Sequence, residues 1–177
     1  MTIPYKVGII SASDRASRGE REDKSGSLLR SLVESLPAEV VAYRVLPDEK
    51  EVLKKILLHM ADLFACDLIL TTGGTGLSPR DVTPEATREV IEKEIPGIQE
   101  AIRLESLKKT NFAMLSRAIA GIRGKTLIVN FPGSPAAVLD AFEILRPIFN
   151  HAIKLIHGEV EDCQTSSHLS YSHSSSH

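Results

Sequence analysis

The chain has 177 residues, enough for one domain of ordinary size that buries most of its apolar surface. Hydrophobic residues make up 42% and charged residues 25%, a composition typical of soluble globular proteins. A formal net charge of −2, with only 5% aromatic residues and no Trp, argues against nucleic acid or an anionic membrane as the main partner. No apolar run reaches membrane-spanning length and the N-terminus lacks a signal-peptide pattern, so we expect a cytoplasmic protein.

The first half of the chain alternates between strand and helix patterns. An apolar run over residues 7–10 predicts a buried strand, and leucines and a valine at helical spacing over 28–36 predict a helix. A second strand is predicted over 40–46, followed by an amphipathic helix over 52–64. The run over 68–72 predicts a third strand.

In the second half, Thr83 with Pro84 predicts a capped helix start, and Pro96-Gly97 breaks that helix before it resumes over 98–109. Two strand-like runs, 118–122 and 126–129, predict a hairpin.

Ser134 predicts the cap of the last helix, which Pro135 begins. This alternation predicts a three-layer α/β sandwich with a largely parallel central sheet and a small β-hairpin. We expect one domain over residues 1–162 and a flexible, polar Ser- and His-rich tail over 163–177.

The third predicted strand leads into the most informative segment, a turn with three glycines over residues 73–76. Arg80-Asp81 and then Thr83-Pro84-Glu85 follow it. This order of strand, glycine turn, acidic group and helix predicts a pocket for a phosphate-bearing ligand at the strand end. The two commonest nucleotide motifs are absent, because Ile119 and Pro79 occupy positions where they require glycine.

Three aspartates follow predicted strands: Asp14 the first, Asp48 the second, and Asp81 the loop after the third. Parallel strands end at the same edge of a sheet, so we expect these carboxylates at one rim. Mg²⁺ is usually held by one or two carboxylates together with the phosphates of a substrate. The sequence therefore predicts magnesium-dependent phosphate chemistry at this rim.

Each aspartate also has a purely structural interpretation. Asp48 with Glu51 resembles a capping box worth about 1 kcal/mol, which is the favoured interpretation of Asp48 taken alone. Asp14 is equally well explained by a side-chain-to-backbone turn. Asp81 next to Arg80 could form a surface ion pair of about 0–1 kcal/mol, although the glycine loop favours a functional role.

The motifs Gly73-Gly74-Thr75-Gly76, Arg80 to Ala86 and Asn130 to Pro135 resemble the molybdenum-cofactor biosynthesis domain family. MogA-type adenylyltransferases, MoaB proteins and the G domain of gephyrin belong to this family. The resemblance runs from about residue 6 to 157 and includes further motifs at residues 11–15, 46–49 and 114–117. It implies a homotrimeric α/β protein that binds molybdopterin and Mg-ATP, transfers AMP to the pterin phosphate and releases pyrophosphate. A molybdenum insertase is the implied partner enzyme.

The resemblance also implies roles for individual residues. Asp48 matches the catalytic aspartate that handles Mg-ATP and ligates the metal, and Asp81 matches a catalytic aspartate of the pterin pocket. Ser116 matches a serine near the substrate. The other implied substrate-binding residues lie in the loops that follow the predicted strands: Ser13, Asp14, Gly73, Gly74, Thr75, Gly76, Pro132, Gly133 and Ser134. A phosphate monoester is already anionic near neutral pH, so positioning and charge neutralisation would carry the reaction without a strong base.

Three alternatives stay open at this point. One is a non-catalytic, trimeric pterin-binding carrier, against which Asp48 argues. Another is the molybdenum-inserting step, which in related insertases comes with additional domains. The third is a metal-binding protein that uses His168, His173 and His177, whose spacing matches no defined metal site.

Overall fold

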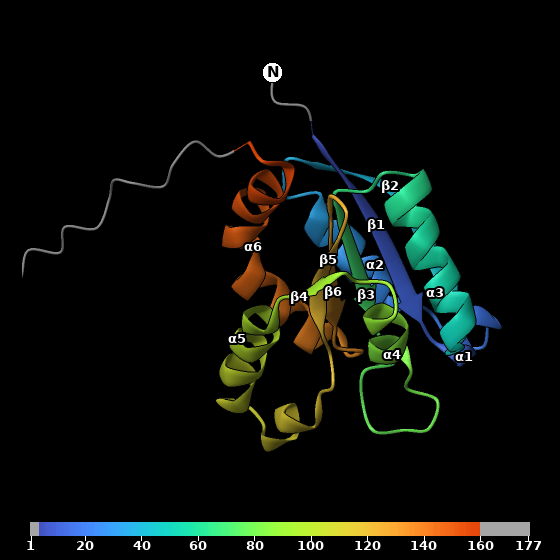
Figure 1. The fold of residues 1–177 in the computed structure, drawn as a ribbon. Helices are drawn as coiled ribbons and strands as arrows, with labels where there is room; N and C mark the ends of the chain where they lie inside the picture. The colour runs from blue at the N-terminus through green and yellow to red at the C-terminus, as the bar shows by residue number, and fades with distance from the viewer. Residues whose placement is uncertain (1–3, 160–177) are drawn as a thin grey trace, which may run out of the picture.

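The computed structural model describes residues 4–159, whose arrangement is shown in Figure 1. The first elements are β1 (Tyr5–Ala12), α1 (Asp14–Ser17), α2 (Lys24–Val33), β2 (Ala38–Leu46), α3 (Lys50–Leu58), η1 (His59–Leu63) and β3 (Leu68–Thr72). They are followed by α4 (Thr83–Arg88), β4 (Lys93–Glu94), α5 (Pro96–Leu107), η2 (Asn111–Leu115), β5 (Ala120–Arg123), β6 (Thr126–Phe131) and α6 (Pro135–His157). None of the helices between residues 4 and 159 has the length and apolar character needed to span a membrane.

The six strands of the described residues form one sheet in the order β2-β1-β3-β6-β5-β4. β2, β1, β3 and β6 are parallel, whereas β5 pairs antiparallel with β6 and β4 with β5. The register places Ser11 beside Thr72, and Thr72 beside Phe131. The carboxyl ends of β1, β3 and β6 therefore lie next to one another at one edge. The predicted largely parallel sheet with a β-hairpin is confirmed.

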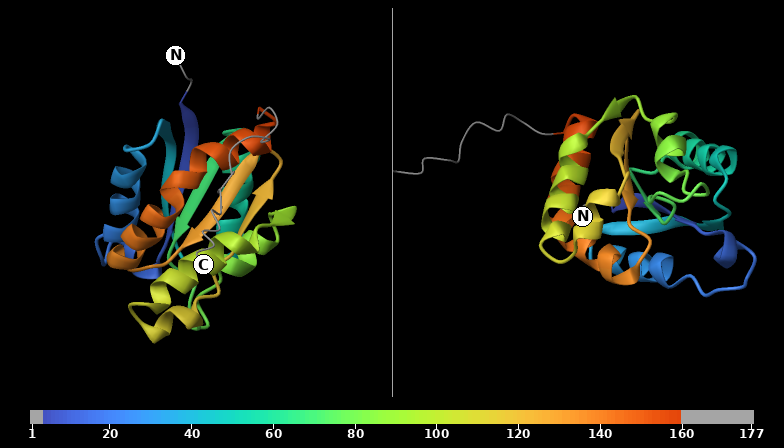
Figure 2. Two further views of the ribbon diagram at one scale, coloured as in Figure 1. Left: turned by 90° about the vertical axis from the view of Figure 1, so that its left-hand side faces the viewer. Right: turned by 90° about the horizontal axis from the view of Figure 1, so that it is seen from below.

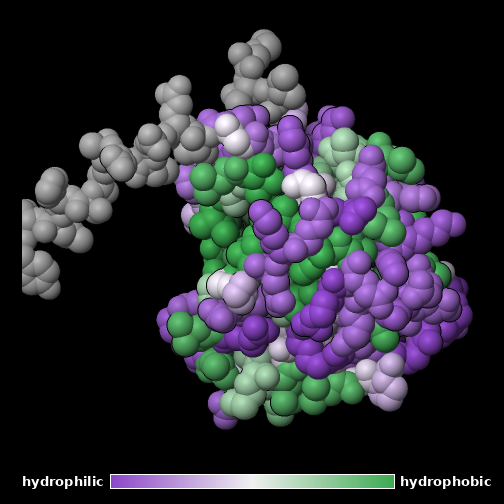
Figure 3. All heavy atoms as spheres, in the orientation of Figure 1, coloured by the Kyte–Doolittle hydropathy of each residue, from purple (hydrophilic) through white to green (hydrophobic). Residues whose placement is uncertain are grey.

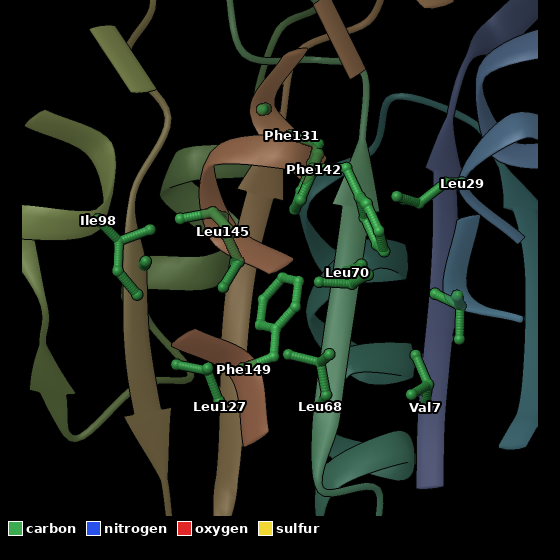
Figure 4. Close-up of a cluster of buried hydrophobic side chains, with 14 of the residues drawn as sticks. Val7, Leu29, Leu68, Leu70, Ile98, Leu127, Phe131, Phe142, Leu145 and Phe149 are labelled. Atoms are coloured by element: carbon green, nitrogen blue, oxygen red, sulfur yellow. The ribbon is translucent and has the colours of Figure 1, made fainter. Parts of the chain in front are cut away.

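Helices cover both faces of the sheet, as Figure 2 shows, with α2, α5 and α6 on one face and α3, η1 and α4 on the other. Because side chains alternate along a strand, β3 places Leu68 and Leu70 in the first core and Ile69 in the second. Phe142 and Phe149 of α6 pack in the first core with ring centroids 5.9 Å apart (Figure 4). Each contributes about 1.5–3 kcal/mol through burial. The predicted three-layer sandwich is confirmed.

The predicted cap of the last helix is confirmed. The Ser134 side chain accepts a hydrogen bond from the backbone N–H of Ala137 at 3.3 Å, so it caps α6, whose first residue is Pro135. Cys66, just before β3, is buried with 2% exposure. Cys163, the three tail histidines and the whole predicted tail over 163–177 lie outside the described residues.

Two predicted helix caps are wrong. Val82, not Thr83, is the N-cap residue of α4, and Glu49, not Asp48, is the N-cap residue of α3. Neither N-cap residue makes a side-chain capping bond. The reason is tertiary: the side chains of Thr83 and Asp48 are directed to the loop after β3, where both lie beside Gly74.

The helix boundaries also differ from the pattern. α4 ends at Arg88, and the two residues of β4 (93–94) pair with β5, which takes the chain out of the helix before Pro96 begins α5. The segment after β1 forms the short helix α1, which the apolar pattern does not indicate. The helix after β2 passes into the π-helical turn η1 at its end.

Candidate active site

A polar cavity of about 210 Å³ opens at the carboxyl ends of β1 and β3. In the sheet, β2 lies on one side of β1 and β3 lies on the other, so the direction in which strands are added reverses at β1. Ligands of open α/β sheets bind in the crevice that such a reversal of strand order creates. The cavity is lined by the end of β1, by residues 72–74 after β3, and by residues 21–25 around the start of α2.

Asp14, after β1, and Asp48, after β2, are joined by two reciprocal hydrogen bonds. The Asp14 N–H donates to Oδ2 of Asp48 at 2.9 Å, and the Asp48 N–H donates to Oδ1 of Asp14 at 3.0 Å. The second carboxylate oxygen of Asp48, Oδ1, is buried and has no hydrogen-bond partner among residues 4–159. Burial raises the pKa of Asp48, and the charges of Asp14 and Asp81 raise it further. An unpartnered carboxylate oxygen in a polar cavity suits a hard cation.

Arg80 pairs with Asp14 and not with its neighbour Asp81. Its Nε and Nη2 donate to Oδ2 and Oδ1 of Asp14 at 2.9 and 2.8 Å, and this bonding lowers the pKa of Asp14 to about 2. Oδ2 of Asp81 instead accepts the Ser78 N–H at 3.0 Å. The predicted Arg80–Asp81 ion pair is therefore wrong. The predicted local turn at Asp14 is wrong as well, because the hydroxyl of Ser13 caps α1 while Asp14 reaches Asp48 and Arg80.

The turn after β3 needs glycine for two reasons. Gly73 and Gly74 have φ values of +88° and +66°, which L side chains rarely adopt. A Cβ on Gly73 would collide with the carbonyl oxygen of Ala12, and a Cβ on Gly74 would collide with Oγ1 of Thr83 and press on Oδ1 of Asp48. Oγ1 of Thr83 is also buried and has no hydrogen-bond partner in the described part of the chain. Two unpartnered oxygens thus lie beside the glycine backbone.

A second cavity, an apolar groove of about 290 Å³, lies between α5, η2 and the start of α6. Ile102, Phe112 and Leu115 give it its apolar character. Ser116 also lines it, and the Ser116 hydroxyl oxygen accepts a long hydrogen bond of 3.4 Å from the Ala118 N–H. Figure 3 shows hydrophobic side chains along the lower edge of the molecule, where η2 lies.

The structure distributes the predicted site residues over both cavities. Ser13, Asp48, Gly73, Gly74, Asp81 and Gly133 line the polar cavity, and Thr75, Gly76, Ser116 and Pro132 line the apolar groove. Asp14 and Ser134 line neither; Asp14 supports Asp48, and Ser134 caps α6. The loop over 73–76 and the turn over 132–133 each contribute to both cavities. We call these two segments, residues 73–76 and 132–133, the shared wall. Ligands bound in the two cavities would therefore lie next to each other.

Arg117 holds this wall in place, a role that the pattern alone did not indicate. Its Nε and Nη2 donate to the carbonyl oxygens of Gly76 and Asp81, both at 2.7 Å, and its Nη1 pairs with Glu85. The only sequence signal is its position in the motif at 114–117. Its partners are backbone atoms more than thirty residues away, which no local pattern reveals.

Asn130 forms a second unpredicted support beneath the wall. It is fully buried, and its Nδ2 donates to the hydroxyls of Thr71 at 3.0 Å and Thr87 at 2.9 Å. Its Oδ1 accepts the Ile119 N–H at 3.2 Å, and its carbonyl oxygen accepts a bond from Gln99 at 2.9 Å. Every polar group of this side chain is therefore paired, which rigidifies the end of β6.

Residues 4–159 contain no group of three or more His, Cys, Asp or Glu side chains that could by itself hold a metal ion. A metal at Asp48 would therefore share its ligands with a bound substrate. Mg²⁺ commonly binds in this way, keeping several waters and using one or two carboxylates with substrate phosphates. The unpartnered Oδ1 of Asp48 fits such a role.

Comparisons with known proteins agree with this geometry. The family described as "Probable molybdopterin binding domain" matches residues 8–151. Molybdopterin adenylyltransferase of Helicobacter pylori (strain J99) is 43% identical over 155 residues, covering 86% of this chain and 88% of that protein. The enzyme of the same name from Escherichia coli K12 is 38% identical over 156 residues, covering 86% and 78%.

Known structures show the same fold. The molybdopterin biosynthesis enzyme MoaB from Thermus thermophilus superimposes with a TM-score of 0.82 at 49% identity, covering 87% of this chain and 97% of that chain. The molybdopterin biosynthesis Mog protein from Mycobacterium ulcerans gives a TM-score of 0.82 at 37% identity, covering 89% and 99%. Since the family match spans most of the chain and these relatives share its fold, the protein belongs to the molybdopterin-binding domain family of molybdenum cofactor biosynthesis.

Proposed function

We propose that this protein is a molybdopterin adenylyltransferase, which transfers AMP from Mg-ATP to molybdopterin and releases pyrophosphate. The observation that carries the proposal is that the polar cavity and the apolar groove are adjacent, since the shared wall lines both. Group transfer between two substrates requires that both reactants bind next to each other. The names of the relatives from Helicobacter pylori and Escherichia coli support the same reaction.

In this proposal the polar cavity receives the nucleotide phosphates. Four carboxylates line it (Glu22, Asp23, Asp48 and Asp81) against two cations, Arg21 and Lys24. An acidic lining repels a bare triphosphate and favours its magnesium complex. Oδ1 of Asp48 would hold Mg²⁺, which when bound neutralises charge on the phosphates. The glycine backbone at residues 73–74 would cradle the anion.

The apolar groove is the proposed binding site of the pterin. The pterin ring would lie against Ile102, Phe112 and Leu115, with Ser116 as a polar contact. In this proposal Asp81 would lie between the two ligands, because it lines the polar cavity and its Oδ2 lies close to Gly76, a residue of the groove. Asp81 would thus contact the pterin on the side that faces the nucleotide.

Transfer then requires few groups of the protein. An oxygen of the pterin phosphate attacks the α-phosphorus of ATP, a new phosphorus–oxygen bond forms, and the bond to the bridging oxygen breaks. Pyrophosphate leaves with the bonding electrons. Because the attacking phosphate is already anionic, the residues act by positioning and charge neutralisation. In this proposal the backbone at residues 73–76 would position the phosphates, and Asp48 would hold the Mg²⁺ that supplies charge neutralisation.

A single-turnover assay tests the proposal. Purified protein is mixed with molybdopterin, Mg²⁺ and α-labelled ATP, and labelled adenylyl-molybdopterin is measured. We expect product from the wild type and a loss of at least about a hundredfold in Asp48→Asn, with pterin binding retained. Asp62→Asn is the matched control, since Asp62 pairs with Arg123 away from both cavities. Tight pterin binding without product at any Mg²⁺ concentration would identify a carrier instead.

The finer assembly is part of the same proposal: a cytoplasmic homotrimer that passes its product to a molybdenum insertase. Apolar side chains exposed on α5 and η2 support self-association, among them Leu104, Phe112 and Met114, which are 64%, 80% and 62% exposed. Sedimentation measures the assembly directly, and a monomer at micromolar concentration would contradict it.

A further inference from the structure

A third cavity, of about 370 Å³, lies between α4, the start of α5 and residues 116–119. Three arginines line it, Arg88 of α4, Arg103 of α5 and Arg117, and we call it the arginine cavity. Glu94 is the carboxylate in its lining. Figure 3 shows strongly hydrophilic side chains on this face, between the positions of α5 and α4 in Figure 1.

The positive charge of this cavity is only partly balanced. Arg117 is paired with Glu85, but Arg88 and Arg103 form no ion pair with any carboxylate among residues 4–159. The lining thus holds three guanidinium groups and one carboxylate, that of Glu94, and Glu85 outside the lining pairs with Arg117. The arginine cavity keeps an excess of positive charge, unlike the polar cavity, whose lining is acidic.

Arg103 is held in a fixed orientation. Its Nη1 donates to the carbonyl oxygens of Ser116 at 3.3 Å and Ala118 at 3.2 Å. Its Nε and Nη2 make no hydrogen bond within the described part of the chain. A guanidinium that is oriented by two carbonyl groups and keeps free N–H donors is arranged to bind an oxyanion.

The start of α5 adds to the positive charge of the arginine cavity. Pro96 is the first residue of this 12-residue helix and lines the cavity, and its N-cap residue, Ile95, offers no capping side chain. The first N–H groups of a helix lack intrahelical partners and carry partial positive charge. The helix start thus reinforces the three arginines.

We propose that the arginine cavity binds a tetrahedral oxyanion of the phosphate class, at a site separate from the polar cavity. The planar guanidinium fork matches the oxygen spacing of such anions. Gln99, Arg103, Ser116 and Ala118 line both this cavity and the apolar groove, so the two cavities are adjacent. The anion is therefore either free in solution or the phosphate of a ligand in the groove.

Inorganic phosphate tests the site without ATP or pterin, so the result is independent of the proposed transferase activity. ¹⁵N-labelled protein is titrated with sodium phosphate at constant ionic strength, with sodium chloride as the blank. We expect saturable shifts of the backbone amides of residues 97–99 and 116–119. Arg88→Gln should weaken phosphate binding about tenfold, because it removes one charge-assisted contact. Arg88 makes no hydrogen bond in the described chain, so this variant keeps the fold.

Two further variants sharpen the test. Arg146→Gln removes a surface arginine of α6 that pairs with Glu143, and should leave phosphate binding unchanged. Arg103→Lys keeps the charge but removes the fork, and should weaken binding while the spectrum stays dispersed. Shifts confined to residues 11–25 and 72–74, lost in Arg21→Gln and unchanged in Arg88→Gln, would overturn the proposal. The absence of saturation would overturn it too.

A second arm identifies the source of the anion. Molybdopterin is titrated into the phosphate-saturated protein. Competition between the two, together with weaker molybdopterin binding in Arg88→Gln, assigns the cavity to the phosphate of a groove ligand and would contradict the proposed orientation of the pterin phosphate toward the nucleotide. Simultaneous binding assigns it to a free anion.

Discussion

Replacing Gly74 by alanine tests the geometry of the glycine turn most directly. Its backbone has φ of +66°, and a Cβ there would collide with Oγ1 of Thr83 and lie 3.0 Å from Oδ1 of Asp48. Gly19 offers a matched control. Its φ is +73°, and a Cβ there would have nothing within 4 Å. The two substitutions share the cost of a left-handed backbone and differ in the collision.

The magnitudes follow from this comparison. A left-handed alanine costs about 1–2 kcal/mol in either variant. Overpacking against Thr83 and Asp48 adds about 1–3 kcal/mol at Gly74 only. We therefore expect the free energy of unfolding to fall by about 1–2 kcal/mol in Gly19→Ala and by about 2–5 kcal/mol in Gly74→Ala.

Equilibrium urea denaturation measures both losses from the midpoint, provided that the slope of the transition stays constant. Equal losses in Gly74→Ala and Gly19→Ala would refute the reasoning, because they would mean that the turn has room for a side chain. Product formation gives a second readout: the displaced carboxylate of Asp48 should lower adenylyl transfer in Gly74→Ala alone.

Two further outcomes are expected. Burial raises the pKa of the Cys66 thiol to about 11. In Cys163→Ser, where Cys66 is the remaining thiol, we expect the native protein to react with iodoacetamide at pH 8 about a hundredfold more slowly than the urea-unfolded protein. Rapid labelling of the native protein would contradict this expectation. The pKa of Asp14 is lowered to about 2 by Arg80, so its stabilising contribution is complete above about pH 4 and is lost as the pH falls toward 2. The urea midpoint of the wild type should therefore fall more steeply over this range than that of Asp14→Asn, and parallel profiles would count against the ion pair.

The features that follow from local pattern were predictable. Alternating apolar runs predicted the layers and the hairpin, and the order of strands and loops predicted that Asp14, Asp48 and Asp81 would lie at one edge. Parallel strands bring their carboxyl ends together whatever their exact lengths, so this prediction tolerated boundary errors of several residues. The functional roles of these residues stay predictions.

The features that depend on distant partners were not predictable. Arg80 is adjacent to Asp81 in sequence, yet it pairs with Asp14, 66 positions away. Asp48 looks like a helix cap until the reciprocal bonds with Asp14 are seen. The separation of Ser116 from the polar cavity depends on the placement of α5 and η2, which periodicity does not determine.

The shared wall has a consequence for folding. Its two halves, residues 73–76 and 132–133, follow strands that pair only when segments some sixty residues apart come together. Neither cavity can exist in a chain that has formed only its local helices. Ligand binding therefore requires that the whole sheet is formed. A ligand at a hundred times its dissociation constant would add about 2.7 kcal/mol to the free energy of unfolding of the entire fold. In a cell, the supply of substrate would thereby set how long each copy of the protein survives unfolding and proteolysis.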